Sequence, residues 1–343
     1  MARVDMTETE QGRQENERSG SRFRTTLDGL RHDRGIWRRG ILIALCAVGL
    51  TLLMVLHADI PNRIGNLGSL TETFLPWLGL FVPLLLVLAL LRRSATALIA
   101  LLLPAVVWLN LFGGLVADKS AAGGDLTVAT HNVNADNPDP GGTARSLAAS
   151  GADVLALEEL KGDVVPAYER GLAETYPYHS VQGTVGLWSK LPLRAAQPVD
   201  IRMGWTRAMR ATVVTPKGEV AVYVAHLPSV RVKMNAGFTA NQRDVSADAL
   251  GEAISDDPHE RLVLLGDLNG TMNDRALNAV TSQLRSTQGA AGDGFGFSWP
   301  ASFPMARIDQ IMVKGVEPMS SWALPETRSD HLPVAARVRL DAS

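Results

Sequence analysis

Four short segments in the C-terminal two-thirds of the chain carry carboxylate, amide or imidazole side chains beside an apolar, strand-like run. Carboxylate oxygens suit hard divalent cations, and Mg²⁺ takes one or two of them while keeping water for substrate oxygens. A nearby imidazole can stabilise negative charge that develops during a reaction. These residue types predict one metal-dependent phosphoryl-transfer site. The segments are Leu155-Ala-Leu-Glu-Glu159, Leu265-Gly-Asp-Leu-Asn269, Arg307-Ile-Asp-Gln310 and Ser329-Asp-His-Leu-Pro333.

Each motif alone also has an ordinary structural interpretation. Glu158-Glu159 would be a solvated strand end, and Gly266-Asp-Leu-Asn269 would be a tight turn that the glycine permits. His226 and Asn132, each at the end of an apolar run, would be hydrogen-bonded polar residues. Six such motifs in one chain favour the catalytic interpretation over six coincidences.

The pairing of Asp309 with an imidazole adds to that interpretation. A buried carboxylate beside a histidine holds its tautomer and stabilises its charged form, which suits a histidine that binds an anionic transition state. Asp330 and His331 are neighbours, so both reach one site only at a strand end or a turn.

The elements that must position these residues alternate between strand and helix patterns, which predicts an α/β sandwich of two sheets with helices on the outer faces. Ala208–Thr215 and Val220–His226, joined by Pro-Lys-Gly, predict an antiparallel hairpin. The predicted helices are Thr143–Ala149, Val164–Thr175 and Gln242–Ile254. The predicted strands are Leu126–Asn132, Val154–Leu157, Gly186–Ser189, Ala208–Thr215, Val220–His226, Leu262–Gly266, Ile308–Val313 and Val334–Leu340.

Three uncharged apolar runs precede this region: Ile41–Leu56, Phe74–Leu91 and Ala95–Val116. The second and third have the length that a hydrocarbon layer of about 30 Å requires. A signal peptide is the alternative for the first run, but a long hydrophilic tail precedes it and no small-residue cleavage pattern follows. We therefore expect three transmembrane helices.

Basic residues predict the orientation of these helices. Arg31, Arg34, Arg38 and Arg39 lie just before the first run, and Arg92-Arg93 joins the second to the third. Because such residues concentrate on the cytoplasmic side, we expect a multi-pass protein of the plasma membrane with a cytoplasmic N-terminus and an extracytoplasmic C-terminal domain. The predicted organisation is a disordered tail (1–35), a three-helix anchor (36–117), a flexible linker (118–125) and the outer domain (126–343).

Charge and cysteine content exclude some classes of function. From Asp118 onward the chain has 21 Lys and Arg against 26 Asp and Glu. A protein that grips duplex DNA gains from a basic face, so we do not expect a nucleic-acid partner. The single cysteine, Cys46, lies in the first apolar run, which excludes a disulfide within the outer domain and a zinc site built from cysteines.

The motifs together, above all Gly266-Asp-Leu-Asn269 and Ser329-Asp-His-Leu-Pro333, resemble those of the endonuclease/exonuclease/phosphatase superfamily, the fold of DNase-I-like nucleases, over about Leu126–Leu340. The resemblance implies a four-layered α/β sandwich and a Mg²⁺-dependent site, with Mn²⁺ as an alternative. Glu159 would bind the metal, with Asp330 as a second ligand or a link to it, and Asn132 would orient Glu159 or the phosphate.

The resemblance also implies roles for the remaining residues. Asp267 would align or deprotonate the attacking water, and Asn269 would brace the phosphate. His331, held by Asp309, would stabilise the phosphoryl centre, and His226 would contact a phosphate oxygen or aid the leaving group. Glu158 replaces the Gln of many relatives, which adds a charge near the metal.

Three apolar runs before such a domain resemble a membrane-anchored actinobacterial branch that includes a streptomycete teicoplanin-resistance protein. That resemblance implies a polyprenyl pyrophosphate substrate such as undecaprenyl pyrophosphate, a cell-wall role and glycopeptide resistance. A bilayer tether raises the effective concentration of a lipid substrate. The partners expected are therefore the lipid bilayer and this lipid, and the sequence points to no protein partner. Candidates for a cationic rim are Lys190, Arg207, Arg210, Arg231 and Lys233.

Two other classes of function remain open at this stage. One is a membrane-anchored phosphodiesterase of the nuclease or phospholipase/sphingomyelinase type. The other is a non-catalytic envelope protein that uses the fold to bind a partner or a cell-wall precursor. A decayed enzyme is expected to have lost one of the motif residues, and all of them are present.

Overall fold

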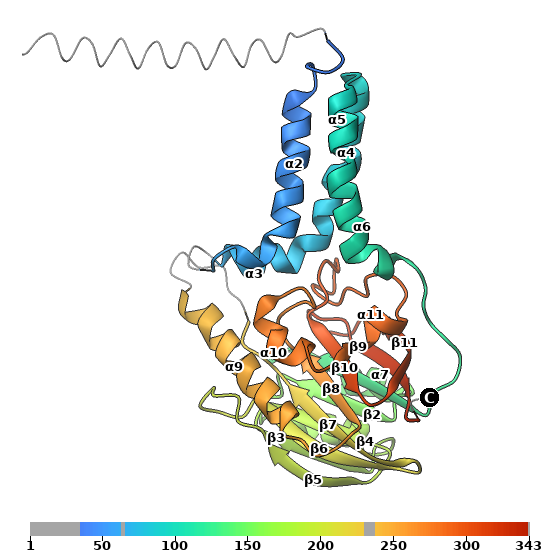
Figure 1. Ribbon diagram of the computed structural model, residues 1–343. Helices are drawn as coiled ribbons and strands as arrows, with labels where there is room; N and C mark the ends of the chain where they lie inside the picture. Colours follow the sequence, from blue (N-terminus) through green and yellow to red (C-terminus); the bar gives the residue numbers. More distant parts are fainter. Residues whose placement is uncertain (1–34, 63–65, 230–236, 342–343) are drawn as a thin grey trace, which may run out of the picture. The chain divides into compact units, whose positions relative to one another are not determined.

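The computed structural model describes residues 35–62, 66–229 and 237–341, and the predicted tail 1–35 lies almost wholly outside them. The described chain divides into two compact units (Figure 1). The first combines the residues up to Leu56 with Leu75–Leu111, and the second combines His57–Phe74 with the chain from Phe112 onward. The predicted boundaries, which assign 36–117 to one anchor, differ from this division.

The first unit consists of apolar helices. Two helical stretches of the chain, Leu67–Leu91 and Ala95–Val116, each divided between the two units, are long and apolar enough to cross a membrane, whereas the helix in the first predicted span has only 15 residues. At a rise of 1.5 Å per residue it covers roughly 22 Å, less than the hydrocarbon thickness. The elements are α2 (Ile41–Val55), η2 (Leu75–Leu80), α4 (Phe81–Leu91), α5 (Ala95–Ala100) and α6 (Leu102–Val116).

One end of this unit collects the basic residues. The Arg39 side chain donates two hydrogen bonds, of 2.9 and 2.6 Å, to the carbonyl of Arg93. Thr96 Oγ1 donates to the carbonyl of Trp37, and the Ala95 amide donates to the carbonyl of Ile36. The start of α2 and the turn between α4 and α5 therefore lie together.

The second unit is built on two six-stranded sheets. In the first sheet the order is β11 (Glu317–Ala323), β12 (Val334–Arg339), β1 (Leu126–Asn132), β2 (Val154–Glu158), β4 (Val185–Ser189) and β3 (Tyr178–Gln182). In the second it is β5 (Leu193–Pro198), β6 (Ala208–Thr215), β7 (Gly218–Ala225), β8 (Leu262–Asp267), β10 (Asp309–Lys314) and β9 (Arg285–Ser286). The predicted hairpin is confirmed as β6 and β7, which pair antiparallel from Ala208 with Ala225 to Thr215 with Gly218.

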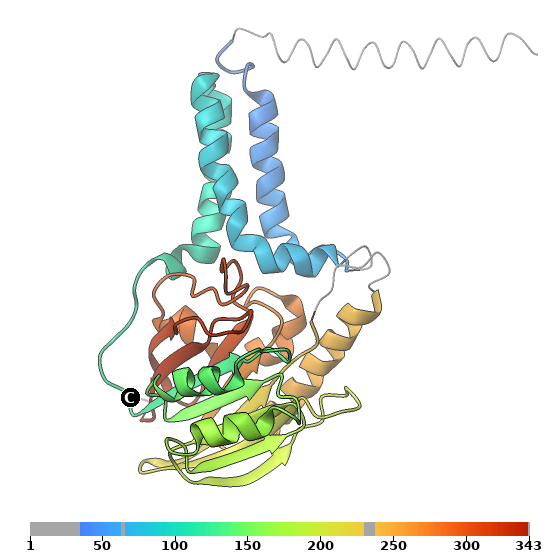
Figure 2. The same ribbon diagram turned by 180° about the vertical axis from the view of Figure 1, so that it is seen from behind.

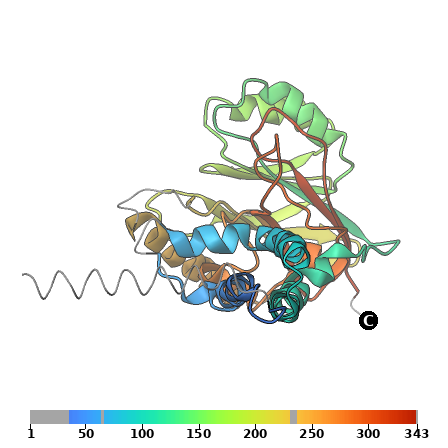
Figure 3. The same cartoon turned by 90° about the horizontal axis from the view of Figure 1, so that it is seen from above.

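The two sheets pack face to face, and helices cover their outer faces. Buried Val, Leu and Ala side chains from both sheets, such as Val128, Val154, Val222 and Val263, form the central core. Helices α7 (Pro140–Ala148) and α8 (Val165–Leu172) cover the first sheet, and α9 (Gly237–Ser255) with α10 (Asn278–Thr281) covers the second. Figures 2 and 3 show α7 and α8 in green and α9 in gold on opposite sides of the strands. The four-layered α/β sandwich is the predicted fold.

The second unit also contains the segment between the first two apolar runs. This segment forms η1 (His57–Asp59) and α3 (Leu67–Phe74). Ser69 and Glu72 of α3 are fully buried, although they are polar. The predicted linker is hydrogen-bonded to the rest of the second unit. The Ala121 amide donates to the carbonyl of Met319 at 2.6 Å, and Lys119 Nζ donates to the carbonyl of Gly289. The remaining short helices are η3 (Arg275–Leu277) and α11 (Thr287–Ala291).

Candidate active site

Six of the eight predicted site residues line one pocket of about 360 Å³ in the second unit, and the other two, Asn132 and Asp309, are buried and contact its lining residues. Because β1 and β2 run parallel, as do β7 and β8, their carboxyl ends lie at the same edges of the two sheets. Asp309 on β10 pairs directly with Asp267 on β8, so two motifs far apart in sequence become neighbours. The pocket is lined by Thr73, Glu159, Arg207, His226, Ser229, Asp267, Asn269, Trp299, Ile308, Asp330 and His331.

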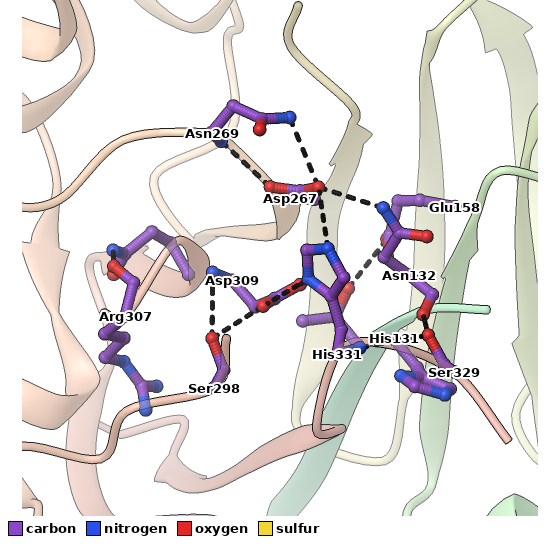
Figure 4. A network of polar contacts seen from close by, with 12 residues as sticks. His131, Asn132, Glu158, Asp267, Asn269, Ser298, Arg307, Asp309, Ser329 and His331 are labelled. Atoms are coloured by element: carbon purple, nitrogen blue, oxygen red, sulfur yellow. Dashed lines mark hydrogen bonds and ion pairs between the residues drawn. The ribbon is translucent and has the colours of Figure 1, made fainter. Parts of the chain in front are cut away.

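Asp267 is held at the floor of the site by two amides (Figure 4). Asn132 Nδ2 donates to Asp267 Oδ2 at 2.9 Å, and the Asn269 backbone amide donates to Oδ1 at 2.9 Å. Burial of the carboxyl group, with Asp309 nearby, raises the pKa of Asp267 to about 7. A carboxyl group with this pKa is suited to accept a proton from water near neutral pH.

His331 forms a buried dyad with Asp309. His331 Nδ1 lies 2.9 Å from Asp309 Oδ2, and Ser298 Oγ donates to that same oxygen at 2.6 Å (Figure 4). Burial alone opposes the imidazolium, but the carboxylates of Asp309 and Asp267 outweigh it and raise the pKa of His331 to about 10. Burial likewise opposes ionisation of Asp309, but the pairing with His331 lowers the pKa of this carboxyl. The dyad therefore presents a cationic imidazole whose Nε2 lies 3.9 Å from Asp267 Oδ2.

His226 differs from His331 in charge. It is almost fully buried, and this burial, together with the charges of Arg207 and His331, places the pKa of His226 well below its usual value. Its Nε2 lies 3.6 Å from Glu159 Oε1 and 3.7 Å from Asp267 Oδ2. The site thus holds one neutral and one cationic imidazole.

Glu159 offers the best-placed oxygens for a metal ion. Its side chain is 32% exposed, and it receives hydrogen bonds from Asn132 Nδ2 at 3.2 Å and from the Ala135 amide at 3.0 Å. These donors orient the carboxylate without neutralising it, and the exposed Asp330 lines the same pocket. Hard oxygen donors with room for water fit Mg²⁺ or Mn²⁺.

A second group of potential metal ligands, Asp267, Asp309 and His331, lies within 4.8 Å. We do not assign a metal to it. Asp309 is already engaged by His331 Nδ1 and Ser298 Oγ, and an imidazole with its pKa near 10 is protonated and cannot donate a lone pair.

Glu158 does not add the charge that the sequence led us to expect. It lies in the first sheet with no exposed surface, and Thr130 Oγ1 donates to its Oε1 at 2.7 Å. Burial raises the pKa of Glu158 well above its ordinary value, so the carboxyl group is neutral. A protonated Glu is close in shape and polarity to Gln, which explains why the replacement fits.

Of the candidates for a cationic rim, only Arg207 lines the pocket among the described residues. It is oriented by hydrogen bonds from Nε to the carbonyl of His226 at 2.9 Å and from Nη2 to that of Leu227, and it stacks over Trp205 at 4.9 Å. Arg210 instead pairs with Asp257, and Lys190 contacts Asp153. Arg231 and Lys233 lie outside the described residues.

Comparison with known proteins agrees with this geometry. A profile of the Endonuclease/Exonuclease/phosphatase family matches residues 129–331. The chain belongs to this family. No curated protein matches it. Family members are hydrolases, and the motif residues from Asn132 to His331 fall within the matched range.

Solved structures of the family share the fold. An endonuclease/exonuclease/phosphatase from Bacteroides vulgatus is 18% identical, with a TM-score of 0.53, and the match covers 63% of this chain and 99% of that one. A mannosyl-6-phosphatase from Bacteroides thetaiotaomicron is 17% identical, with a TM-score of 0.51 and coverage of 62% and 99%. Danio rerio TDP2, complexed with a single-stranded DNA product, is 16% identical, with a TM-score of 0.52 and coverage of 63% and 99%.

Several residues of the site were not predicted from the sequence. Ser298 supports Asp309, and Ser329 Oγ donates to the carbonyl of Asn132 at 2.6 Å, which joins the last motif to the first. Trp299 and Thr73 line the pocket. Ser329 belongs to a recognised motif, but Thr73 lies more than fifty residues before the first strand and no sequence signal links it to the site.

Proposed function

We propose that this protein is a membrane-anchored, divalent-metal-dependent phosphohydrolase that hydrolyses a polyprenyl pyrophosphate such as undecaprenyl pyrophosphate. One observation carries the proposal: the pocket lined by Glu159, Asp267 and His331 is also lined by Thr73, which directly precedes the second apolar run. A catalytic wall residue that is the direct neighbour in sequence of an apolar run suits a substrate that has a phosphorylated head and a hydrocarbon tail.

In the proposed reaction, water attacks the terminal phosphorus and the bond to the bridging oxygen breaks. Asp267 takes the proton of the water, and Asn132 and Asn269 keep this carboxylate aligned. Cationic His331, held by Asp309, stabilises the charge on the phosphoryl oxygens, and His226 contacts a further oxygen or the leaving group. Glu159, with Asp330, would hold the metal, which when bound supplies Lewis-acid activation of the phosphate.

Exposed apolar side chains support membrane anchoring. Leu91 is 76% exposed, and Leu102 and Val106 are each 63% exposed. Soluble monomers rarely expose contiguous apolar surfaces of this kind. With flanking Trp37 and Arg38-Arg39 at the interface, the short first helix would be a third span.

The composition of the second unit supports the proposed orientation. His57–Phe74 and the chain from Phe112 onward form one compact body, which supports a topology with both on the same side of the membrane. The two apolar helices between them would then span as a pair. The basic residues around Arg39 and Arg93 gather at one end of the first unit, as expected for a cytoplasmic face.

Charge supports a compact anionic head over a nucleic acid. Arg207 is one cation at the pocket, suited to a second phosphate, while the domain as a whole is net acidic. Duplex DNA would require many phosphate contacts along a basic surface. A role in cell-wall metabolism and glycopeptide resistance would follow from a cell-wall lipid substrate.

The first test is phosphate release from undecaprenyl pyrophosphate by the full-length, detergent-solubilised protein with Mg²⁺. The matched variant is Asp267→Asn, which keeps the size of the side chain but cannot accept a proton from water. We expect release that disappears with a chelator and in the variant. Nicking of plasmid DNA, or cleavage of sphingomyelin, without phosphate release would replace this proposal with the phosphodiesterase alternative.

A further inference from the structure

Arg243 is a fully buried cation that joins its own helix, α9, to two other segments of the second unit. Its Nη1 donates to the carbonyl of Asn269 at 2.9 Å and lies 2.7 Å from Asp274 Oδ2. Its Nη2 donates to Asp274 Oδ1 and to Ser69 Oγ, each at 3.0 Å. Nη1 and Nη2 are satisfied in this way, whereas Nε has no hydrogen-bond partner among the described residues, and the planar fork holds several acceptors in one arrangement.

The first segment that Arg243 holds is the turn after β8. Asn269 adopts a left-handed backbone with φ of 48°, a conformation that Asn tolerates better than most L residues. Its backbone amide and its side-chain amide both donate to Asp267, at 2.9 and 3.2 Å. The Arg243 bond to the Asn269 carbonyl therefore acts on the residue that aligns the proposed general base.

The second segment is α3, from the loop between the first two apolar runs. Ser69 Oγ accepts from Arg243, and one turn later Thr73 Oγ1 donates to the Ser69 carbonyl at 2.8 Å. Thr73 lines the catalytic pocket. Thr271, in the same turn as Asn269, donates to the Glu72 carbonyl at 3.2 Å and adds a second tie. Figure 3 shows α3 in light blue beside α9 in gold.

We propose that Arg243 is a positioning residue that fixes the Asn269 turn against α3. The segment before the second apolar run thereby contributes to the geometry of the active site. Arg243 touches no substrate; it acts through Asn269 on Asp267 and through Ser69 on the wall formed by Thr73. Hydrolysis thereby depends on how the loop next to the membrane segment is placed. The inference rests on the proposed function only for its kinetic readout.

The test compares Arg243→Lys, Ser69→Ala and the double variant with wild type in the full-length protein. Lysine keeps the charge but has no fork to hold Asn269, Asp274 and Ser69 together. Arg202→Lys is the matched control, because Arg202 pairs with Glu252 in an exposed ion pair beside α9. The readouts are kcat and KM on the lipid and on p-nitrophenyl phosphate esters, the unfolding temperature, and hydrogen exchange of peptides 67–74 and 268–277.

We expect Arg243→Lys to lower kcat at least about ten-fold with little change in KM, because the loss falls on alignment in the transition state. Ser69→Ala should lower kcat about three-fold, and the double variant should match Arg243→Lys because both changes break one network. Exchange should rise in both peptides together, and Arg202→Lys should resemble wild type.

Two results would overturn the inference. One is wild-type kcat per folded molecule in Arg243→Lys, which would make Arg243 purely structural. The other is wild-type kcat in Ser69→Ala with faster exchange confined to 268–277, which would separate α3 from the site. If Arg243→Lys does not fold, Ser69→Ala alone decides. If wild type hydrolyses p-nitrophenyl esters but not the lipid, the proposed substrate is wrong. The role of Arg243 is then tested with kcat on the p-nitrophenyl esters.

Discussion

Asp309→Asn is expected to convert a pH-independent contribution of His331 into a pH-dependent one. The rise in the pKa of His331 from 6.5 to about 10 corresponds to roughly 5 kcal/mol in favour of the charged imidazole, at 1.36 kcal/mol per pH unit. Asparagine can still accept from Nδ1 but carries no charge. Without the Asp309 charge the pKa of His331 falls, because burial lowers it and only Asp267 and Asp330 still raise it, so fewer molecules carry the cation as the pH rises to 8.

The assay is the ratio of variant to wild-type kcat from pH 6 to pH 8.5 at saturating Mg²⁺. We expect a ratio of about one tenth at pH 8 and a ratio that rises toward one as the pH falls to 6. Asp309→Asn also changes the pKa of Asp267, which both Asp309 and His331 influence, so the acid limb of each pH profile is assigned to Asp267 and the alkaline limb to His331. Ser298→Ala is the matched control: it removes the 2.6 Å hydrogen bond to Asp309 but leaves its charge, so its ratio should not change with pH.

Activity of Asp309→Asn equal to wild type at pH 8 would refute the reasoning, because it would mean that the charge of His331 contributes nothing. A large loss that is the same at every pH would also refute it. That result would assign Asp309 to the orientation of the imidazole and not to its charge.

Three further predictions concern the metal, the neighbouring glutamate and stability. Glu159→Gln should raise the Mg²⁺ concentration for half-maximal activity at least about ten-fold, measured by activity and calorimetric titration; an unchanged requirement would place the metal elsewhere. Glu158→Gln should keep kcat within about three-fold of wild type, because the buried carboxyl is already neutral, whereas Glu158→Leu leaves the Thr130 hydroxyl unpaired and should cost about 1–3 kcal/mol of stability in urea unfolding. Since the pKa of His331 is raised on folding, its contribution to the free energy of unfolding is complete below about pH 6.5 and is lost as the pH rises toward about 10. Urea unfolding of wild type should show this decline in stability with pH. A decline of equal size in Asp309→Asn would contradict the prediction.

Strands were predictable in proportion to their burial. The eight predicted strands correspond to β1, β2, β4, β6, β7, β8, β10 and β12. The four that were not predicted, β3, β5, β9 and β11, are the edge strands of the two sheets. An edge strand pairs on one side only and is less enclosed, so it needs no continuous apolar run; β5 contains only half-buried and exposed residues.

Charge states were less predictable than positions. Glu158 and Glu159 are adjacent in sequence, yet one is fully buried and neutral and the other opens onto the pocket. Side chains alternate along a strand, so the direction of each depends on which face the sheet buries. His226 and His331 differ in the same way, because only His331 has Asp309 against its ring.

The sequence by itself determined the family, the interior strands and the residues that gather in the pocket. Glu159 and Asn269 follow buried strands, whereas Asp309 and His331 lie at or just before the start of strands that run antiparallel to their neighbours, so all four reach the same edges of the sheets. Only the tertiary structure decided which of these groups are charged, since that depends on burial and on partners from distant strands. Only the tertiary structure shows that Thr73, Ser69 and Arg243 lie at or beside the active site. Their polar side chains follow no pattern in the chain, and the buried contacts of α3 with the Asn269 turn exist only once both segments are folded together.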